Sequence, residues 1–275
     1  MQDFVLITGS SGGIGRECVK AFHAAGIGVF AADVRPHHAV TSPDLIPISM
    51  DLRQESSIEQ GVELIRSHLG ESRRLIGLVN NAGVDFNAPL VTLLPSEIRA
   101  MVDVNVVGSI LLTRSVLSLL EPDRARLIFV GSAMGLFATP TVGVYAATKW
   151  AIEGLCDALR VELGAAGVRV ALVEPGVVQT EMTAQAPQML DTMLSRMNTE
   201  QRAMYEKTMR KIVQMSSAPG AGVGPQAVAR TIVSAMTDPG MRSRYRVGTD
   251  SRIVGWLRHL PDGMRDFIQR KSLQL

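Results

Sequence analysis

Residues 4–15 read Phe-Val-Leu-Ile-Thr-Gly-Ser-Ser-Gly-Gly-Ile-Gly, and this stretch decides the fold. Its first five residues are apolar or β-branched, which predicts a buried strand. Apolar residues then recur with helical spacing from Ile14 to Ala25, so a glycine-rich turn joins a strand to a helix. Such a turn can bind phosphate groups, because glycines allow close approach and the helix N–H groups favour an anion. The candidate binding residues are Gly9, Ser11, Gly13, Ile14 and Gly15.

The spacing of these glycines narrows the class of ligand. The order is Gly9-x-x-x-Gly13-x-Gly15 rather than G-x-G-x-x-G, and no Gly-Lys-Ser/Thr follows as it does in nucleoside triphosphatases. A dinucleotide site is the favoured interpretation, and a purely structural glycine turn is the alternative.

An acidic residue at the end of the next strand indicates which dinucleotide binds. Asp33 stands eighteen residues beyond Gly15, where a carboxylate is expected to bond the adenosine ribose hydroxyls. We therefore expect NAD as the cofactor and NADP as the less favoured one. Arg35 instead favours NADP, because a guanidinium can attract a 2′-phosphate. Asp51, after the third strand, is a candidate on the adenine side.

The first two thirds of the chain alternate short apolar runs with helical patterns. The predicted strands are 4–8, 28–33, 45–50, 75–80, 126–132 and 169–174. The predicted helices are 14–25, 57–69, 98–120 and 145–165. The strands are apolar on both faces, which is typical of a parallel sheet covered on both sides. We predict an α/β fold, a single Rossmann-type doubly wound parallel sheet with helices on both faces.

The region after residue 176 differs in composition. Residues 177–224 are rich in Met, Gln, Ser and Ala, and Met189, Met193 and Met197 recur at helical spacing. A connection of this length tends to be functional, so we expect a helical lid over a substrate site. A helix at 226–236, a strand at 245–247 and a basic tail are predicted to follow. The 275 residues thus form one domain, with a core at 1–176, a lid at 177–224 and a C-terminal region at 225–275.

Three residues form a candidate catalytic set. Tyr145 and Lys149 share one face of a predicted helix, so the ammonium can approach the phenol. Lowering a phenol pKa from ~10 to the ~7 of a useful base needs roughly 4 kcal/mol of electrostatic stabilisation. The ammonium and the positive ring of an oxidised nicotinamide can supply it together. Ser132, thirteen residues before Tyr145, ends a strand at the edge that holds the glycine turn, and its hydroxyl can donate to the substrate oxygen.

A Ser-His-Asp hydrolase is excluded. Gly131-Ser132 lacks the G-x-S-x-G elbow, and no histidine lies nearby in the sequence.

With these residues the chain resembles the short-chain dehydrogenase/reductase family over roughly residues 3–181. Residues 8–15 match the cofactor motif of the family, Asn-Asn-Ala-Gly at 80–83 matches its fourth-strand motif, and the catalytic set matches in type, order and spacing. The resemblance implies that Asn105 joins the catalytic residues through a water-linked proton relay. It also implies further cofactor-binding residues, namely Leu52, Asn81, Ala82, Gly83, Tyr145, Lys149, Pro175, Gly176, Val178 and Thr180. A homodimer or homotetramer through the helices near 100–120 and 145–165 is implied as well.

Residues 150–155, 157–163 and 244–250 resemble family members that act on steroids and retinoids. Together with the flexible methionines of the lid, they predict a bulky apolar secondary alcohol or ketone as substrate, such as a steroid, a retinoid or a similar lipid. One alternative is a 3-oxoacyl-type reductase of the same family, whose members usually have a shorter C-terminus. The other is a non-catalytic dinucleotide-binding regulator, which is expected to lack a catalytic residue.

The composition argues against several other classes of protein. A net charge of +2 and 4% aromatic residues do not indicate a nucleic-acid partner. Cys18 and Cys156 lack CxxC spacing and the histidines are scattered, so neither a disulfide framework nor a metal site is expected. The adjacent pair His37 and His38 is a weak metal candidate.

No transmembrane segment is expected. No signal peptide precedes the apolar run at residues 4–7, which favours a cytoplasmic protein. The longest apolar stretch, 102–120, contains Asp103 and Arg114, which predicts a buried helix rather than a membrane span. The arginine-rich tail around Trp256 is expected to be a solvated face, and peripheral membrane contact is the alternative.

Overall fold

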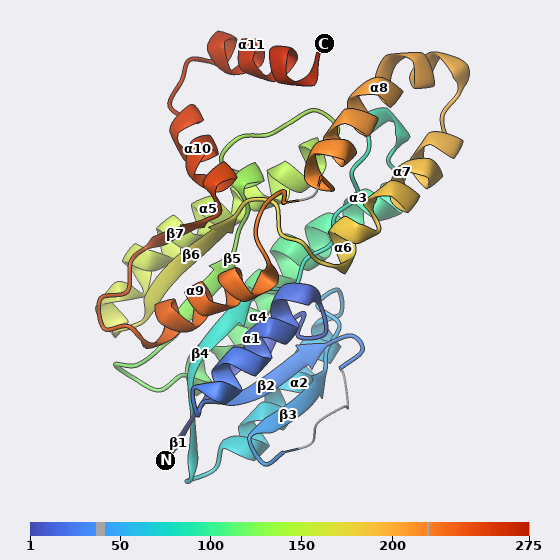
Figure 1. The fold of residues 1–275 in the computed structure, drawn as a ribbon. Coiled ribbons are helices and arrows are strands. Elements are labelled where there is room, and N and C mark those ends of the chain that lie inside the picture. Colours follow the sequence, from blue (N-terminus) through green and yellow to red (C-terminus); the bar gives the residue numbers. More distant parts are fainter. Residues whose placement is uncertain (37–41, 219, 275) are drawn as a thin grey trace.

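One sheet of seven parallel strands organises the chain, with the order β3-β2-β1-β4-β5-β6-β7 (Figure 1). The structure is a computed structural model that describes residues 1–36, 42–218 and 220–274, so His37 and His38 lie outside the described residues. The strands are β1 (Gln2–Thr8), β2 (Gly28–Asp33), β3 (Leu45–Ser49), β4 (Arg73–Asn80), β5 (Arg126–Val130), β6 (Arg169–Pro175) and β7 (Arg244–Val247). The strand order reverses between β1 and β4, and ligands of such sheets bind at the carboxyl ends of the strands beside this point. The predicted doubly wound parallel sheet is confirmed.

Helices cover both faces of the sheet (Figure 1). The helices α1 (Gly13–Ala24) and α9 (Pro225–Thr237) pack on one face, and α2 (Glu55–Leu69), α4 (Ser109–Val116) and α5 (Gly143–Glu162) pack on the other. Alternate residues of β1 serve the two faces, since Val5 and Ile7 contact the first group while Phe4 and Leu6 contact the second. This double burial explains why the strands are apolar without interruption.

The predicted long helix is one helical run with a π-helical turn in its middle. It consists of α3 (Pro95–Val102), the π-helix Asp103–Gly108, α4 and the 3₁₀ turn Leu117–Leu119. Apolar periodicity could not predict the π-helical turn, a distortion frequent at functional sites. By length and composition alone the run Pro95–Leu119 could cross a membrane, but its residues Met101, Leu112 and Val116 are fully buried against the rest of the protein.

The lid consists of three helices, α6 (Glu181–Ala184), α7 (Ala186–Ser195) and α8 (Thr199–Ser216) (Figure 1). Its buried methionines, Met193, Met197 and Met209, form one apolar cluster with Met101 and other core residues. These three methionines therefore serve first as packing residues. Met204, by contrast, is 62% exposed.

The C-terminal region first adds a helix and a strand to the layered fold and then extends beyond the sheet. After α9 and β7 come α10 (Thr249–Leu257) and α11 (Asp262–Leu273), which lie beyond the end of the sheet (Figure 1). Leu273 is the buried residue of α11, whereas Trp256 of α10 is 78% exposed.

Candidate active site

The turn between β1 and α1 is shaped by contacts that leave no room for side chains. Gly9 has a φ of +64°, and a Cβ there would lie 2.8 Å from the Cα of Ala82. A Cβ on Gly15 would clash with the Gly9 carbonyl oxygen. A Cβ on Gly13 would meet the Thr180 methyl group at 2.8 Å. The turn is therefore a backbone cradle at a helix N-terminus, which suits a pyrophosphate.

Asn81 ties this turn to the end of β4. Its side-chain amide donates hydrogen bonds to the carbonyl oxygens of Thr8 (2.9 Å) and Gly9 (3.2 Å). The Thr8 hydroxyl accepts hydrogen bonds from the backbone N–H groups of Asn81 and Ala82, each at 3.0 Å. The two predicted motifs thus form one structural unit.

The predicted ribose-binding carboxylate lies beside the turn. Asp33 ends β2, and its carboxylate accepts hydrogen bonds from the backbone N–H groups of Ser11 and Arg35, each at 3.0 Å. Asp51 is paired with Arg53 at 2.6 Å, and this hydrogen-bonded pair lowers the pKa of Asp51. Both carboxylates therefore lie at the carboxyl ends of β2 and β3, where the sequence pattern predicts the adenosine of the cofactor.

Ser132, Tyr145 and Lys149 come together at the carboxyl end of β5. The Ser132 side chain caps the short 3₁₀ turn Ala133–Gly135 and accepts a hydrogen bond from the Met134 N–H at 3.1 Å. Lys149 is buried, donates a hydrogen bond to the Val130 carbonyl oxygen at 2.9 Å, and lies 5.6 Å from the centroid of the Tyr145 ring.

The pKa of the Tyr145 phenol is not lowered by the chain's own residues. Burial raises this pKa, the Asp85 carboxylate raises it further, and the hydroxyl of Ser132 opposes the rise. Burial also lowers the pKa of Lys149 to about 8, with Asp85 opposing. Within this protein the phenol thus holds its proton at neutral pH. The lowering expected from Lys149 together with an oxidised nicotinamide stays a prediction, and the Asp85 charge acts against it.

Asn105 lies in the π-helical turn and holds the segment after β4. Its side-chain oxygen accepts a hydrogen bond from the Val84 N–H at 2.8 Å, and its amide donates to the Val84 carbonyl oxygen at 2.9 Å and to the Thr148 hydroxyl at 3.1 Å. The side chain is therefore committed to positioning these segments. Its part in a water relay stays a prediction.

The segment after β6 closes the other side of the site. Gly176 lies against the Asp250 carboxylate, which accepts a hydrogen bond from the Val177 N–H at 2.6 Å. Val178 forms a bridge with Val223, and Thr180, the N-cap residue of α6, lies beside Gly13. The predicted nicotinamide-side residues thus lie next to the glycine turn.

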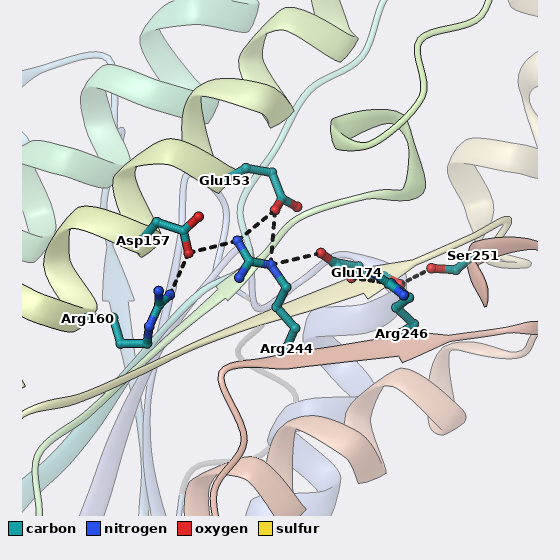
Figure 2. A network of polar contacts seen from close by, with 7 residues as sticks. All are labelled: Glu153, Asp157, Arg160, Glu174, Arg244, Arg246 and Ser251. Carbon is teal, nitrogen blue, oxygen red and sulfur yellow. Dashed lines mark hydrogen bonds and ion pairs between the residues drawn. The ribbon is translucent and has the colours of Figure 1, made fainter. Parts of the chain in front are cut away.

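Figure 2 shows a network of polar contacts that joins α5 to this segment. Glu174, the residue before Pro175, is completely buried and pairs with Arg246 at 3.2 Å and Arg244 at 3.5 Å. Arg244 also reaches Glu153 of α5 at 3.3 Å. The network therefore couples the helix that carries Tyr145 to the strand that leads into the nicotinamide-side segment.

Two features of the site were missed by the sequence analysis. Asp85 is the second residue after the Asn-Asn-Ala-Gly motif, between Val84 and Phe86, and a carboxylate between two apolar residues is a signal that the sequence offers. The network around Glu174 had no local signal, since its members come from α5, β6 and β7.

Comparison with known proteins identifies what this arrangement is similar to. Residues 3–191 match the family model described as short chain dehydrogenase. A 3-amino-tetrahydro-pyrrolizinone reductase of Xenorhabdus hominickii is 30% identical over 90% of this chain and 87% of that protein. The 17-beta-hydroxysteroid dehydrogenase type 6 of Homo sapiens is 30% identical over 99% of this chain and 89% of that protein. A 3-ketoacyl-(acyl-carrier-protein) reductase of Brucella melitensis, solved with NADH, has the same fold, with a TM-score of 0.71 and 22% identity over 90% of this chain and 98% of that one.

The buried acid pair makes the stability of the protein depend on pH. Burial raises the pKa of Glu153 from 4.5 to about 8, the Glu174 carboxylate adds to the rise, and Arg244 opposes it. The folded protein thus holds on Glu153 a proton that the unfolded chain releases near pH 4.5. The contribution of Glu153 to the free energy of unfolding therefore falls as the pH rises from 4.5 to about 8. Glu153→Gln, which mimics the protonated acid, should raise the Tm by about 2–4 °C at high pH, corresponding to on the order of 1 kcal/mol. Thermal unfolding followed in buffers at both ends of this range measures the difference.

The matched control is Asp157→Asn, which removes the 2.8 Å partner of Arg244 and should not stabilise the protein at any pH. If Glu153→Gln raised the Tm by as much at low pH as at high pH, the assignment of the proton to Glu153 would be contradicted.

Proposed function

Because the chain belongs to the short-chain dehydrogenase/reductase family, a family of oxidoreductases, we propose that it interconverts a secondary alcohol and a ketone with a nicotinamide dinucleotide. The observation that carries the proposal is the meeting of Ser132, Tyr145 and Lys149 at the carboxyl end of β5. An assay of nucleotide reduction and oxidation over a panel of alcohols and ketones tests it. A non-catalytic regulator of the same fold would bind the nucleotide without turnover.

The residues present fit the cofactor. Gly9, Gly13 and Gly15 have no room for a Cβ, so the turn offers main-chain groups at the N-terminus of α1, and Asp33 lies beside it at the end of β2. We propose that the cradle receives the pyrophosphate, that Asp33 bonds the ribose hydroxyls, and that Asp51 and Leu52 lie on the adenine side. NAD is then favoured, because a carboxylate accepts bonds from free hydroxyls and repels a 2′-phosphate.

The bound nucleotide supplies or accepts the hydride at the substrate carbon. In the reduction of a ketone, the Tyr145 hydroxyl donates its proton to the carbonyl oxygen, and the Ser132 hydroxyl donates a hydrogen bond to the same oxygen. The Lys149 ammonium stabilises the phenolate left behind, and Asn105 holds the adjacent segment in register.

The apolar surroundings of Tyr145 favour an apolar substrate. Tyr145, Val84 and Phe86 pack against the buried cluster of the lid, which includes Met193. A substrate bound beside the phenol would therefore contact the lid, and a bulky molecule such as a steroid, a retinoid or a similar lipid would bury the most apolar surface. The hydroxysteroid dehydrogenase relative supports this class, and the ketoacyl reductase structure keeps 3-oxoacyl substrates as the alternative.

We also propose a homodimer or homotetramer. Apolar side chains are exposed on the outer faces of the helical run near 100–120 and of α5, among them Val107, Ile110, Trp150 and Val161. Exposed apolar surface of this kind is typical of contacts between subunits. Light scattering during size-exclusion chromatography measures the assembly.

Asp33 is expected to set the preference for NAD. In the unaltered protein, kcat/KM with NAD should exceed that with NADP by about tenfold or more, since a like-charge contact costs several kcal/mol. Asp33→Asn should bring this ratio toward one, because the amide keeps an acceptor oxygen and loses the charge. Glu63→Gln, on the exposed face of α2, serves as the control and should leave the ratio unchanged. A preference for NADP in the unaltered protein would point to Arg35 as the deciding residue instead.

Tyr145→Phe should lower kcat at least ~100-fold, the lower range for the loss of a general acid–base group. Binding of the nucleotide, measured by titration calorimetry, should change little, because the ring keeps its packing. The Tm of the variant provides the control for folding. Substantial turnover by folded Tyr145→Phe protein would remove this residue from the mechanism.

The apolar size of the alcohol should govern turnover. We expect kcat/KM to rise by at least about a hundredfold from a four-carbon alcohol to one of steroid size, because about 25 cal/mol is gained per Å² of apolar surface buried. Met193→Ala removes lid packing and should reduce turnover of large substrates more than that of small ones, whereas the exposed Met204→Ala is the matched control. Equal efficiency with short alcohols would show that the lid is only a packing element.

A further inference from the structure

Asp85 occupies a fixed place next to the catalytic residues. The backbone N–H and C=O groups of the preceding Val84 are both hydrogen-bonded to the Asn105 side chain, at 2.8 and 2.9 Å. These two bonds fix the position of the segment. Two residues earlier, a Cβ on Gly83 would lie 3.8 Å from the Lys149 ammonium. The Asp85 charge lies close enough to Tyr145 and Lys149 to shift the titration of both.

One oxygen of the Asp85 carboxylate has no partner. Its Oδ1 atom is buried without a hydrogen bond, and among the described residues no cation lies within 4.0 Å of the carboxylate. The acid beneath the lid, Glu97, is by contrast paired with Arg196 at 2.6 Å. The Lys149 ammonium is already bonded to the Val130 carbonyl oxygen. A buried carboxylate oxygen without a hydrogen bond is costly, so its retention beside Tyr145 and Lys149 indicates a role in function.

The surroundings restrict what that role can be. Asp85 lies between Val84 and Phe86, two apolar residues that pack with Tyr145 against the lid cluster. The side chain as a whole is half-buried, so it keeps partial access to the outside. A group that enters this apolar environment and satisfies a carboxylate must be a hydrogen-bond donor, and a positively charged donor satisfies it best.

We propose that Asp85 is a specificity-determining residue, which selects substrates that carry a protonated amine near the carbinol or carbonyl carbon. The inference rests on the proposed function and narrows its substrate class to apolar molecules with one cationic nitrogen. The ammonium donates to the Asp85 carboxylate while the reacting oxygen accepts hydrogen bonds from Tyr145 and Ser132. A substrate with a carboxylate at the same place would be repelled.

Three alcohols test this proposal. They share a phenethyl carbinol and differ in the other arm, which ends in an aminomethyl, an ethyl or a carboxymethyl group. At neutral pH the unaltered protein should oxidise the ammonium compound with a kcat/KM about tenfold or more above that of the ethyl compound, and the carboxylate compound should be the poorest, because hydrogen bonds to charged groups are the stronger ones. Asp85→Asn should bring the ratio of ammonium to ethyl compound toward one, whatever its effect on the overall rate. Asp191→Asn, which removes an exposed carboxylate of the lid, should leave the ratio unchanged.

A readout without turnover separates this proposal from the proposed function. With NADH present, the ammonium compound should raise the Tm of the unaltered protein more than the ethyl compound does, and Asp85→Asn should lose the difference. If no alcohol or ketone is turned over but this difference is found, the proposed function fails and the binding role of Asp85 stands. If the ethyl compound is oxidised as well as the ammonium compound, or if Asp85→Asn slows all three equally, the proposal is overturned.

The pH dependence supplies a second check that a merely structural role would not produce. Burial raises the pKa of Asp85 to about 6, while the contact with Asn87 and the Lys149 ammonium of α5 oppose the rise. Tyr145 of α5 is the other titratable group that Asp85 faces. Aliphatic amines titrate near about 10 and stay charged in this range. The preference for the ammonium compound should therefore decline as the pH falls through about 6, and a ratio that is constant from pH 5 to pH 8 would overturn the assignment to Asp85.

Discussion

The close packing of the glycine turn against the end of β4 is the constraint on which the site depends. At Gly9 and Gly15 the backbone meets other backbone, so only residues without a Cβ allow the approach. The hydrogen bonds between Asn81 and Thr8 then hold the carboxyl ends of β1 and β4 together. The chain passes from β4 into Gly83 and Val84. The same contact therefore helps to place Val84 against Asn105 and Gly83 near the Lys149 ammonium.

A second constraint comes from burying charge at the other edge of the site. Glu174 is completely buried, and it is tolerated because Arg244 and Arg246 of β7 face it. A buried ion pair adds little net stability but penalises any arrangement that separates its members. Since Glu153 of α5 belongs to the same network, the catalytic helix and the segment at Pro175 are held in one relative position (Figure 2). The network thus contributes geometric precision where hydride transfer would require it.

The strands and the motif residues were predictable because their signals are local. Each buried strand is an apolar run, and the spacing of Tyr145 and Lys149 reports a helix face directly. The π-helical turn at Asp103–Gly108 was not predictable from apolar periodicity, and the bond of its Asn105 joins it to Val84, which is distant in the sequence. The lowering of the Tyr145 pKa expected with an oxidised nicotinamide stays a prediction. The rise that burial and Asp85 cause in the chain alone could not be read from the sequence, since both are properties of the folded protein. The spacing of residues in the sequence therefore indicates which side chains meet. Their pKa values depend on burial and on neighbouring charges, which only the folded structure shows.

The opposing charges of Asp85 and Lys149 give the site a defined resting state. Burial and the Asp85 carboxylate keep the proton on Tyr145, as the proposed role of the phenol as an acid toward a carbonyl oxygen requires. The same carboxylate favours the charged form of Lys149, which burial alone would disfavour. An additional positive charge near the phenol is then what would make the reverse, base-catalysed step accessible. Tyr145 packs with apolar residues against the lid cluster, where charges are weakly screened, so one carboxylate can influence the protons on both Tyr145 and Lys149.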